Sequence, residues 1–327
     1  MKCFAVLLLC SLSLHVRAQE PATLKLTKTI ALPGVKGRFD HFAIDAKGHR
    51  LFVAALGNNT LEIIDTAEGK RLKTISGLHK PTGVLYLAAQ NQIAVANGDD
   101  GTLKVFDGTS YALVKTLGSL DDADNLRFDD RTKQMFLGYG DGAIAVIDST
   151  TMKQTASIKL AAHPESFQLE AQGNRVFVNV PDAKQVAVID RDKQTVTATW
   201  SMEKFHANFP MALDEVGHRL FIGCRQPARL VVFDTATGKT VTDLAISGDT
   251  DDLFYDAKRK RLYISCGDGF IDVISQRNAD TCEIKERIAT RSGARTAYSS
   301  PVLNQFYLAV PQRGSQPTEL QVFSVQD

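Results

Sequence analysis

Short hydrophobic runs recur along the chain, and each ends in a polar turn. The clearest run leads up to an aspartate and is followed later by two less regular copies that end in serine. The seven copies are LEIID (61–65), LKVFD (103–107), IAVID (144–148), VAVID (186–190), LVVFD (230–234), IDVIS (271–275) and LQVFS (320–324). Their last residues lie 41 to 49 positions apart, so the chain is built from seven units of nearly equal length.

Each unit contains three further runs that are typical of strands. In the first unit these are HFAID (41–45), RLFVAA (50–55) and RLKTISG (71–77). They are rich in β-branched and aromatic residues, and no segment after residue 18 keeps a helical apolar period for three turns. Four short strands in 40 to 45 residues are typical of one β-propeller blade. The pattern therefore predicts an all-β protein, a seven-bladed β-propeller.

The seventh unit ends with the chain and has no outer strand of its own. The segment TLKLTKTIAL (23–32) near the N-terminus has the character of the outer strands. We expect it to pair with the last blade and close the ring, because an unpaired sheet edge invites aggregation.

The strand motifs resemble those of a known family. FVAALGNNTLEIID (52–65), FVNVPDAKQVAVID (177–190) and FIGCRQPARLVVFD (221–234) resemble the repeats of the bacterial YVTN-repeat propellers, also called YncE-like proteins. The resemblance covers residues 19–327, which we interpret as a single domain, and it implies a scaffold with many uses. The chain is more distantly similar to two metal-dependent propeller groups, the gluconolactonase-like lactonases and the streptogramin B lyases, but their catalytic residues cannot be matched motif by motif.

The first 18 residues are interpreted as a secretory signal peptide. Lys2 precedes an apolar run over residues 3–16, and Ala18 occupies the position before the expected cleavage. This run is too short to span a bilayer, so no membrane span is expected. This signal peptide predicts a secreted or periplasmic protein.

Three cysteines follow the signal peptide, Cys224, Cys266 and Cys282. We interpret them as small buried hydrophobic residues, with a disulfide or a soft-metal pair formed by Cys224 and Cys266 as the alternative.

Charge gives no indication of the partner. The chain has 38 Lys and Arg against 37 Asp and Glu, a formal net charge of +1, and it has no basic face of the kind that neutralises phosphates. Nucleic acid is therefore not an expected partner. We expect a monomer that binds a small polar ligand or another periplasmic protein.

Polar residues precede every predicted inner strand, and they differ from blade to blade. In a propeller these loops open around the central channel on one face, so their side chains should converge there. If these loops served only as turns, the same residues should recur in every blade, so their variety favours a ligand site. The alternative is that these polar side chains bond nearby backbone groups in Asx turns. The predicted ligand-binding residues are Arg38, Asp40, His41, Lys80, Asp124, Asn125, His163, Glu165, His206, Asn208, Asp251, Asp252 and Arg295.

Several chemistries fit this ring. Its oxygen and imidazole donors suit a divalent cation, Ca²⁺, Mg²⁺ or a transition metal. The possible metal ligands are Asp40, His41, Asp124, Glu165 and Asp251. Crowded carboxylates raise one another's pKa, so the candidates for acid–base catalysis are His41, Asp124, Glu165 and Asp251, with His163 and His206 as alternatives. The three basic residues would either pair with the acids or bind an anionic ligand.

Two functions follow from these features. The first is a binding or scaffolding protein with a polar ligand at the central channel. The second is a hydrolase or lyase, metal-assisted and lactonase-like, that acts on a small molecule in the same funnel. A paired acid and base at the channel mouth would favour the enzyme.

Overall fold

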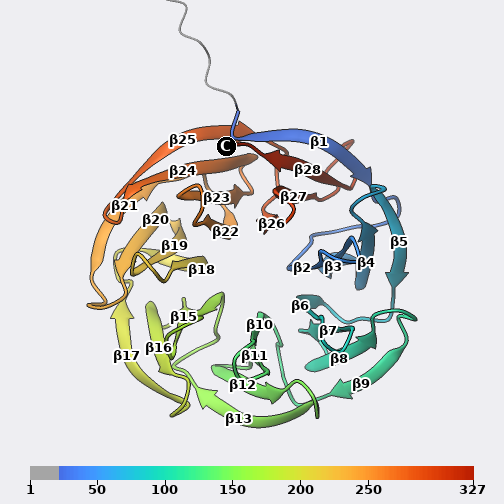
Figure 1. Cartoon of the computed structure of the whole chain (residues 1–327), viewed down its shortest axis with the longest axis horizontal. Coiled ribbons are helices and arrows are strands. Elements are labelled where there is room, and N and C mark those ends of the chain that lie inside the picture. The colour runs from blue at the N-terminus through green and yellow to red at the C-terminus, as the bar shows by residue number, and fades with distance from the viewer. Residues whose placement is uncertain (1–21) are drawn as a thin grey trace, which may run out of the picture.

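The computed structural model describes residues 22–327 as seven four-stranded antiparallel sheets around a central axis (Figure 1). The predicted all-β seven-bladed propeller is confirmed. The predicted signal peptide, residues 1–18, lies outside the described residues.

Four blades come first in the ring. From the axis outward, their strands are β2 (Phe42–Asp45), β3 (Arg50–Ala55), β4 (Thr60–Asp65) and β5 (Lys70–Ile75); β6 (Pro81–Leu87), β7 (Gln92–Asn97), β8 (Thr102–Asp107) and β9 (Leu113–Leu117); β10 (Leu126–Asp129), β11 (Gln134–Tyr139), β12 (Ala143–Asp148) and β13 (Lys153–Lys159); and β14 (Phe167–Leu169), β15 (Arg175–Val180), β16 (Gln185–Asp190) and β17 (Thr195–Ser201).

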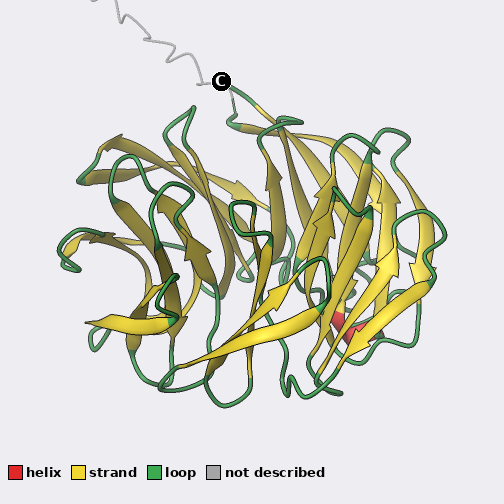
Figure 2. Cartoon of the chain, turned by 60° about the horizontal axis from the view of Figure 1, so that its bottom comes forward, coloured by secondary structure: helices red, strands yellow, loops and turns green. Residues whose placement is uncertain are grey.

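Three blades complete the ring. Their strands are β18 (His206–Asp214), β19 (Arg219–Gln226), β20 (Ala228–Asp234) and β21 (Thr240–Ala245); β22 (Thr250–Asp256), β23 (Arg261–Cys266), β24 (Phe270–Asn278) and β25 (Thr281–Ala289); and β26 (Thr296–Ser300), β27 (Gln305–Val310), β28 (Glu319–Val325) and β1 (Leu24–Ala31). The single 3₁₀ helix of the described residues, η1 (Leu56–Asn58), is short (Figure 2). No helix in residues 22–327 has the length and hydropathy needed to cross a bilayer.

Ring closure occurs as predicted. Strand β1 pairs antiparallel with β28, from Leu24 opposite Val325 to Ala31 opposite Glu319. The first and last parts of the chain therefore share one sheet, and the propeller has no gap between its first and seventh blades (Figure 1).

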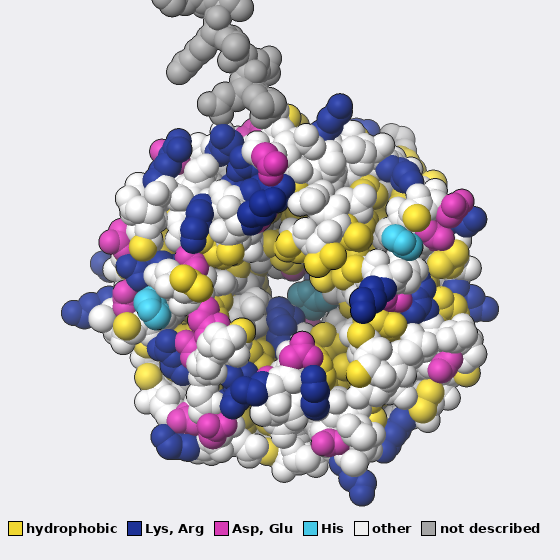
Figure 3. Space-filling view, in the orientation of Figure 1, with side chains coloured by type: hydrophobic (Ala, Val, Ile, Leu, Met, Phe, Trp, Pro, Cys, Tyr) yellow, Lys and Arg dark blue, Asp and Glu magenta, His cyan; other side chains and the backbone are white. Residues whose placement is uncertain are grey.

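The core consists of seven hydrophobic layers, one between each pair of neighbouring blades. On β3, Leu51 and Val53 pack toward the seventh blade, whereas Phe52 and Ala54 pack toward the second. Alternate residues of a strand point to opposite faces, and here both faces are covered. This double burial explains why the middle strands are hydrophobic without interruption. The centre of the ring remains hollow (Figure 3).

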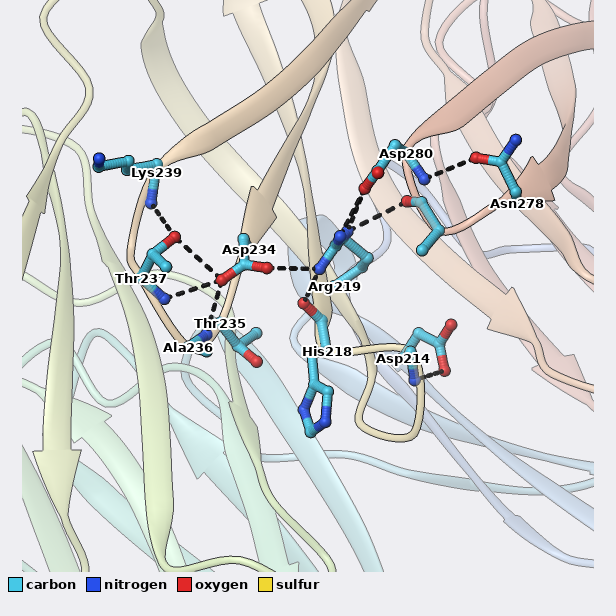
Figure 4. Close-up of polar contacts among 12 residues, drawn as sticks. Asp214, His218, Arg219, Asp234, Thr235, Ala236, Thr237, Lys239, Asn278 and Asp280 are labelled. Atoms are coloured by element: carbon cyan, nitrogen blue, oxygen red, sulfur yellow. Dashed lines mark hydrogen bonds and ion pairs between the residues drawn. The ribbon is translucent and has the colours of Figure 1, made fainter.

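The aspartate that ends the third strand of five blades is a turn residue. In the fifth blade, Asp234 accepts hydrogen bonds from the backbone N–H of Ala236 at 3.0 Å and of Thr237 at 2.8 Å (Figure 4). Its other carboxylate oxygen accepts a bond from Arg219 at 2.7 Å. Such Asx turns satisfy backbone donors locally, so this repeated residue shapes the blade and lies outside the funnel.

The three cysteines of the described region are free. Cys224 and Cys266 are buried within separate hydrophobic layers, and Cys282 is partly buried. They act as small hydrophobic side chains, which was the favoured interpretation.

Candidate functional site

The loops that lead into the inner strands converge at one end of the axis. They surround a cavity of about 190 Å³. Its lining residues are Arg38, Asp40, His41, Lys80, Thr82, Asp122, Asp124, Asn125, His163, Glu165, Ser166, Phe209, Arg225, Asp251 and Arg295. Most of the predicted ring residues therefore meet in one funnel.

A shared backbone arrangement points three carboxylates into this funnel. The N–H of Asp40, Asp124 and Glu165 each donates to a carbonyl of the adjacent second strand, at 2.9 Å in every case. The three residues thus hold equivalent positions in the first, third and fourth blades. Because the backbone is fixed in the same way, the acidic side chains approach one another from different blades.

Two groups of potential metal ligands share Asp124. Oxygen and nitrogen atoms of Asp40, His41 and Asp124 lie within 4.8 Å of one another, and so do those of Asp124, His163 and Glu165. Ligands on opposite sides of a transition metal are about 4.2 Å apart when each bond is about 2.1 Å, so small side-chain rotations would close either group around an ion. The predicted metal ligand Asp251 belongs to neither group, whereas His163, predicted as a ligand-binding residue, joins one.

His163 is oriented by its surroundings. Its Nδ1 lies 2.7 Å from the carbonyl oxygen of Gly140 and therefore carries a proton, which leaves Nε2 facing Asp124 at 3.9 Å. Metal-binding histidines in proteins commonly donate their second N–H to a carbonyl in this way. When the ring is neutral, this contact therefore favours the tautomer that presents an unprotonated Nε2 to the funnel.

The acids of the funnel have unequal proton affinities. Burial and then the charge of Asp124 raise the pKa of Glu165 to about 8. Burial and the charges of Asp124 and Asp251 also raise the pKa of Asp40. Burial opposes ionisation of Asp124 as well, but its contacts with His163 and His41 outweigh burial and lower its pKa. Asp124 is therefore the carboxylate on which the negative charge concentrates.

The histidines are shifted in opposite directions. Burial lowers the pKa of His41, despite the nearby charge of Asp124. Burial also acts to lower the pKa of His163, but interactions with Asp124, the Gly140 carbonyl and Asp122 outweigh it and raise the pKa to about 9. His41 is thus neutral at neutral pH, while metal-free His163 is an imidazolium beside Asp124.

An arginine cluster forms the wall contributed by the last three blades. Arg225 pairs with Asp251, and its guanidinium lies 4.2 Å from the ring centroid of Phe209. Arg295 bonds Asp249 at 2.5 Å and lies 3.2 Å from Asp251. Asp251 is therefore already neutralised by two arginines, which explains its separation from the metal-ligand groups.

The remaining basic residues of the funnel also contact acids. Lys80 donates to Asp122 at 2.9 Å, and Arg38 lies 3.7 Å from Asp40. Ion pairing, one of the two roles expected for the basic residues, is thus present. Arg38 keeps half of its side chain exposed at the mouth.

Asn125 adds an unsatisfied polar group. Only 2% of this residue is exposed, it lines the funnel, and its Oδ1 has no hydrogen-bond partner among the described residues. A buried amide oxygen without a hydrogen-bond donor lowers the stability of the fold unless a ligand or ion binds to it.

Three predicted site residues lie elsewhere. His206 lines a separate surface cavity with Asp182. Asn208 is fully buried, where its amide donates to Asn179 at 2.9 Å and holds the fourth and fifth blades together. Asp252 lies below the funnel, on the wall of the central channel.

The predicted residue set omitted five residues that line the funnel, Thr82, Asp122, Ser166, Phe209 and Arg225. The first four lie within two residues of a predicted site residue, so a wider window along each loop would have included them. Arg225 and Phe209 reach the funnel because they stack on one another. No sequence signal marks that contact.

Comparison with known proteins identifies the fold alone. No protein-family model and no curated protein sequence matches the chain. The chain is similar to one in the crystal structure of the mitotic checkpoint complex, with a TM-score of 0.79 at 14% identity over 100% of this chain and 99% of that one. It is also similar to a chain of Kuenenia stuttgartiensis hydrazine synthase, with a TM-score of 0.71 at 16% identity over 85% of this chain and 95% of that one.

Proposed function

We propose that the propeller is a binding protein whose funnel holds a divalent cation together with a small polar ligand. The observation that carries this proposal is the convergence of five potential ligands, Asp124 among them, from three blades. Without a cation, burial and mutual repulsion favour protonation of these carboxylates, as the raised pKa of Glu165 and Asp40 indicates. Two imidazoles among the ligands favour a transition metal over Ca²⁺ or Mg²⁺.

The polar ligand would occupy the rest of the funnel. Four basic residues line it, Arg38 and Lys80 from the first two blades and Arg225 and Arg295 from the fifth and seventh. A carboxylate or phosphate on the ligand could exchange places with their present carboxylate partners, because guanidinium groups bind both anions in the same geometry. The volume of about 190 Å³ restricts the ligand to a small molecule.

Metal content and thermal melting test the cation. Purified protein should contain a divalent metal, and chelator should lower its melting temperature, with recovery when the metal is restored. Asp124→Asn should remove the metal and the chelator effect, because Asp124 is common to both ligand groups. Asp141→Asn is the matched control, since Asp141 is an exposed acid in the β11–β12 turn, outside the funnel lining.

The proposal fails if no metal co-purifies and added Mn²⁺, Zn²⁺, Ca²⁺ and Mg²⁺ all leave the melting temperature unchanged. It also fails if Asp124→Asn and Asp141→Asn retain the metal equally.

A second candidate function is metal-assisted hydrolysis or lysis of a small ester or lactone in the same funnel. The supporting observation is the separation of pKa values between neighbouring groups, low at Asp124 and about 8 at Glu165. Such a separation supplies a base and an acid at neutral pH. A bound metal would polarise the carbonyl.

Glu165→Gln should abolish turnover of a chromogenic ester by the metal-loaded protein. The wild-type protein should also be assayed with a panel of esters and lactones. If it turns over none of them faster than Asp124→Asn does, this function is excluded.

The repeat motifs support membership of the YVTN-repeat, YncE-like propellers, and the N-terminal pattern supports export to the periplasm or outside the cell. We propose both, with residues 1–18 removed and residues 19–327 as the mature domain. N-terminal sequencing of the protein expressed in a Gram-negative host tests the second point. A mature protein that still begins at Met1 would refute it.

A further inference from the structure

A second cavity of about 300 Å³ lies on the propeller axis, below the funnel. It is lined by the inner strand of every blade, β2, β6, β10, β14, β18, β22 and β26. His41 and Ser166 line both cavities, so they form the boundary between funnel and channel. In Figure 3 the centre of the molecule is hollow, and hydrophobic side chains border part of the opening beside acidic, basic and histidine side chains.

The wall of this channel is about half apolar, a larger share than in the funnel. Its apolar side chains include Phe42, Leu85, Leu126, Met211, Phe254 and Tyr298. Ionisable residues dominate the funnel instead. A cavity that combines apolar side chains with a few placed polar groups suits a small organic ligand that has both characters.

Among the residues that line this wall, Arg127 is the one arginine. Its Nη1 donates to the carbonyl of Leu126 at 2.8 Å and its Nη2 to Ser166 Oγ at 3.2 Å, while its guanidinium lies 5.5 Å from the ring centroid of Phe167. No carboxylate among residues 22–327 lies within 4.0 Å of it, unlike Arg225 and Arg295 in the funnel. A guanidinium has five N–H donors, and an unpaired charge in an apolar channel is costly.

The one acid of the channel is engaged elsewhere. One carboxylate oxygen of Asp252 accepts the backbone N–H of Ala297 at 2.8 Å, and the other lies 3.8 Å from Nδ1 of His41. These contacts hold Asp252, a residue of the sixth blade, against the seventh and first blades. Arg127 therefore faces the channel with donors to spare and no carboxylate in direct contact, and the charges of Asp252 and Asp124 act on it only from a greater distance.

We propose that the channel binds a small amphipathic organic carboxylate, whose carboxylate pairs with Arg127 and whose apolar part packs against Met211, Phe254 and Tyr298. The guanidinium matches a carboxylate in geometry and charge, and the surrounding apolar wall strengthens the pair by excluding water. A volume of about 300 Å³ corresponds to the lower end of ligand pockets. This site requires no cation in the funnel, so it stands independently of the proposed function.

Calorimetric titration with octanoate tests the site, with octanamide as an uncharged probe of the same length. Octanoate should bind the wild type at least tenfold more tightly than octanamide. Arg127→Met should reduce octanoate affinity at least tenfold and abolish the preference over octanamide, whereas Arg127→Lys should keep part of it. Arg131→Met is the control, because Arg131 is an exposed arginine that does not line the channel.

Three results would overturn the proposal: no binding of octanoate, equal binding of octanoate and octanamide, or loss of octanoate binding in Lys80→Met with Arg127→Met unaffected. The last result would place the carboxylate in the funnel. If Arg127→Met fails to fold, methyl NMR of the wild type decides. Octanoate must then shift the Met211 methyl signal, and an unshifted signal contradicts channel binding.

Discussion

At the scale of single residues, one backbone position of the blade serves different purposes around the ring. Asp40, Asp124 and Glu165 use it to present carboxylates to the funnel, whereas Phe209, the corresponding residue of the fifth blade, stacks on Arg225. The three acids share one backbone hydrogen bond that does not involve the side chain, so the choice of side chain is free to follow function. The side chains chosen at this position determine how many ionisable groups meet in the funnel and therefore how each of them ionises.

The metal-free protein should lose stability as pH rises from about 6.5 to 9. In the folded state the pKa is about 8 for Glu165, about 8 for Asp252 and about 9 for His163, against ordinary values of 4.5, 3.8 and 6.5. In this window the folded protein therefore binds more protons than the unfolded chain, so the free energy of unfolding falls as protons are lost. Melting temperatures measured in chelator across this range test the sign.

Two controls sharpen this measurement. Glu165→Gln should flatten the decline, since it removes one of the three groups, while Asp141→Asn should leave the slope unchanged. A saturating divalent cation should reverse the trend, because its ligands bind only when deprotonated. A melting temperature of the metal-free protein that rises between pH 6.5 and 9 would show that the acids are not forced together as described.

At the scale of elements, polar contacts join blades whose hydrophobic layers already match. Arg191 follows β16 in the fourth blade and bonds Asp129 at the end of β10 in the third blade, at 3.0 Å. Both side chains are almost completely buried, with 3% and 4% exposed. Arg191 also donates to the carbonyl of Glu170 at 2.9 Å. This pair fixes the relative position of neighbouring blades at the face opposite the funnel.

Replacing Arg191 with Met should lower the free energy of unfolding by about 3–5 kcal/mol, because Asp129 would keep a buried charge without a partner. Lys193→Met is the control, since Lys193 is an exposed residue of the same turn, and its loss should change stability by less than about 0.5 kcal/mol. Urea denaturation of both variants gives the two values. Equal effects would show that the buried pair does not join the blades.

At the scale of the whole molecule, stability depends on closing the circle. Strand β1 supplies the outer edge of the seventh blade, and its Ile30 is buried with Leu320 in the layer between the seventh and first blades. Exposed large hydrophobic residues such as Leu26, Leu72 and Val196 occur on the outer strands of different blades. Such isolated residues are ordinary surface features.

Ile30→Ala should destabilise the propeller by about 2–4 kcal/mol, as expected for truncation of a buried residue. Leu26→Ala, on the same strand but 48% exposed, should cost less than about 1 kcal/mol. Urea denaturation monitored by fluorescence of Trp200, in the fourth blade, would show whether loosening the closure affects a distant blade. A large loss with Leu26→Ala and none with Ile30→Ala would contradict the observed register.

The sequence determined the architecture by itself, including the strand β1 that closes the ring. Strand alternation and turn residues are local features, and so is the Asp that ends the third strand of five blades. Because the pattern recurs in seven units, a strand that is unclear in one blade can be assigned by comparison with the others. The sequence also indicated which loops meet in the funnel, because their position in the blade fixes the face on which they open.

Only the tertiary structure decided which of the converging side chains form ion pairs, which form the potential metal-ligand groups and which face the channel. Asp251 pairs with two arginines, His163 is turned toward Asp124 by Gly140, and Arg127 faces the channel without a carboxylate in direct contact. These outcomes depend on distances of a few ångströms between side chains from different blades. No spacing along the chain encodes such distances, because each is set by the packing of two sheets whose residues are far apart in sequence.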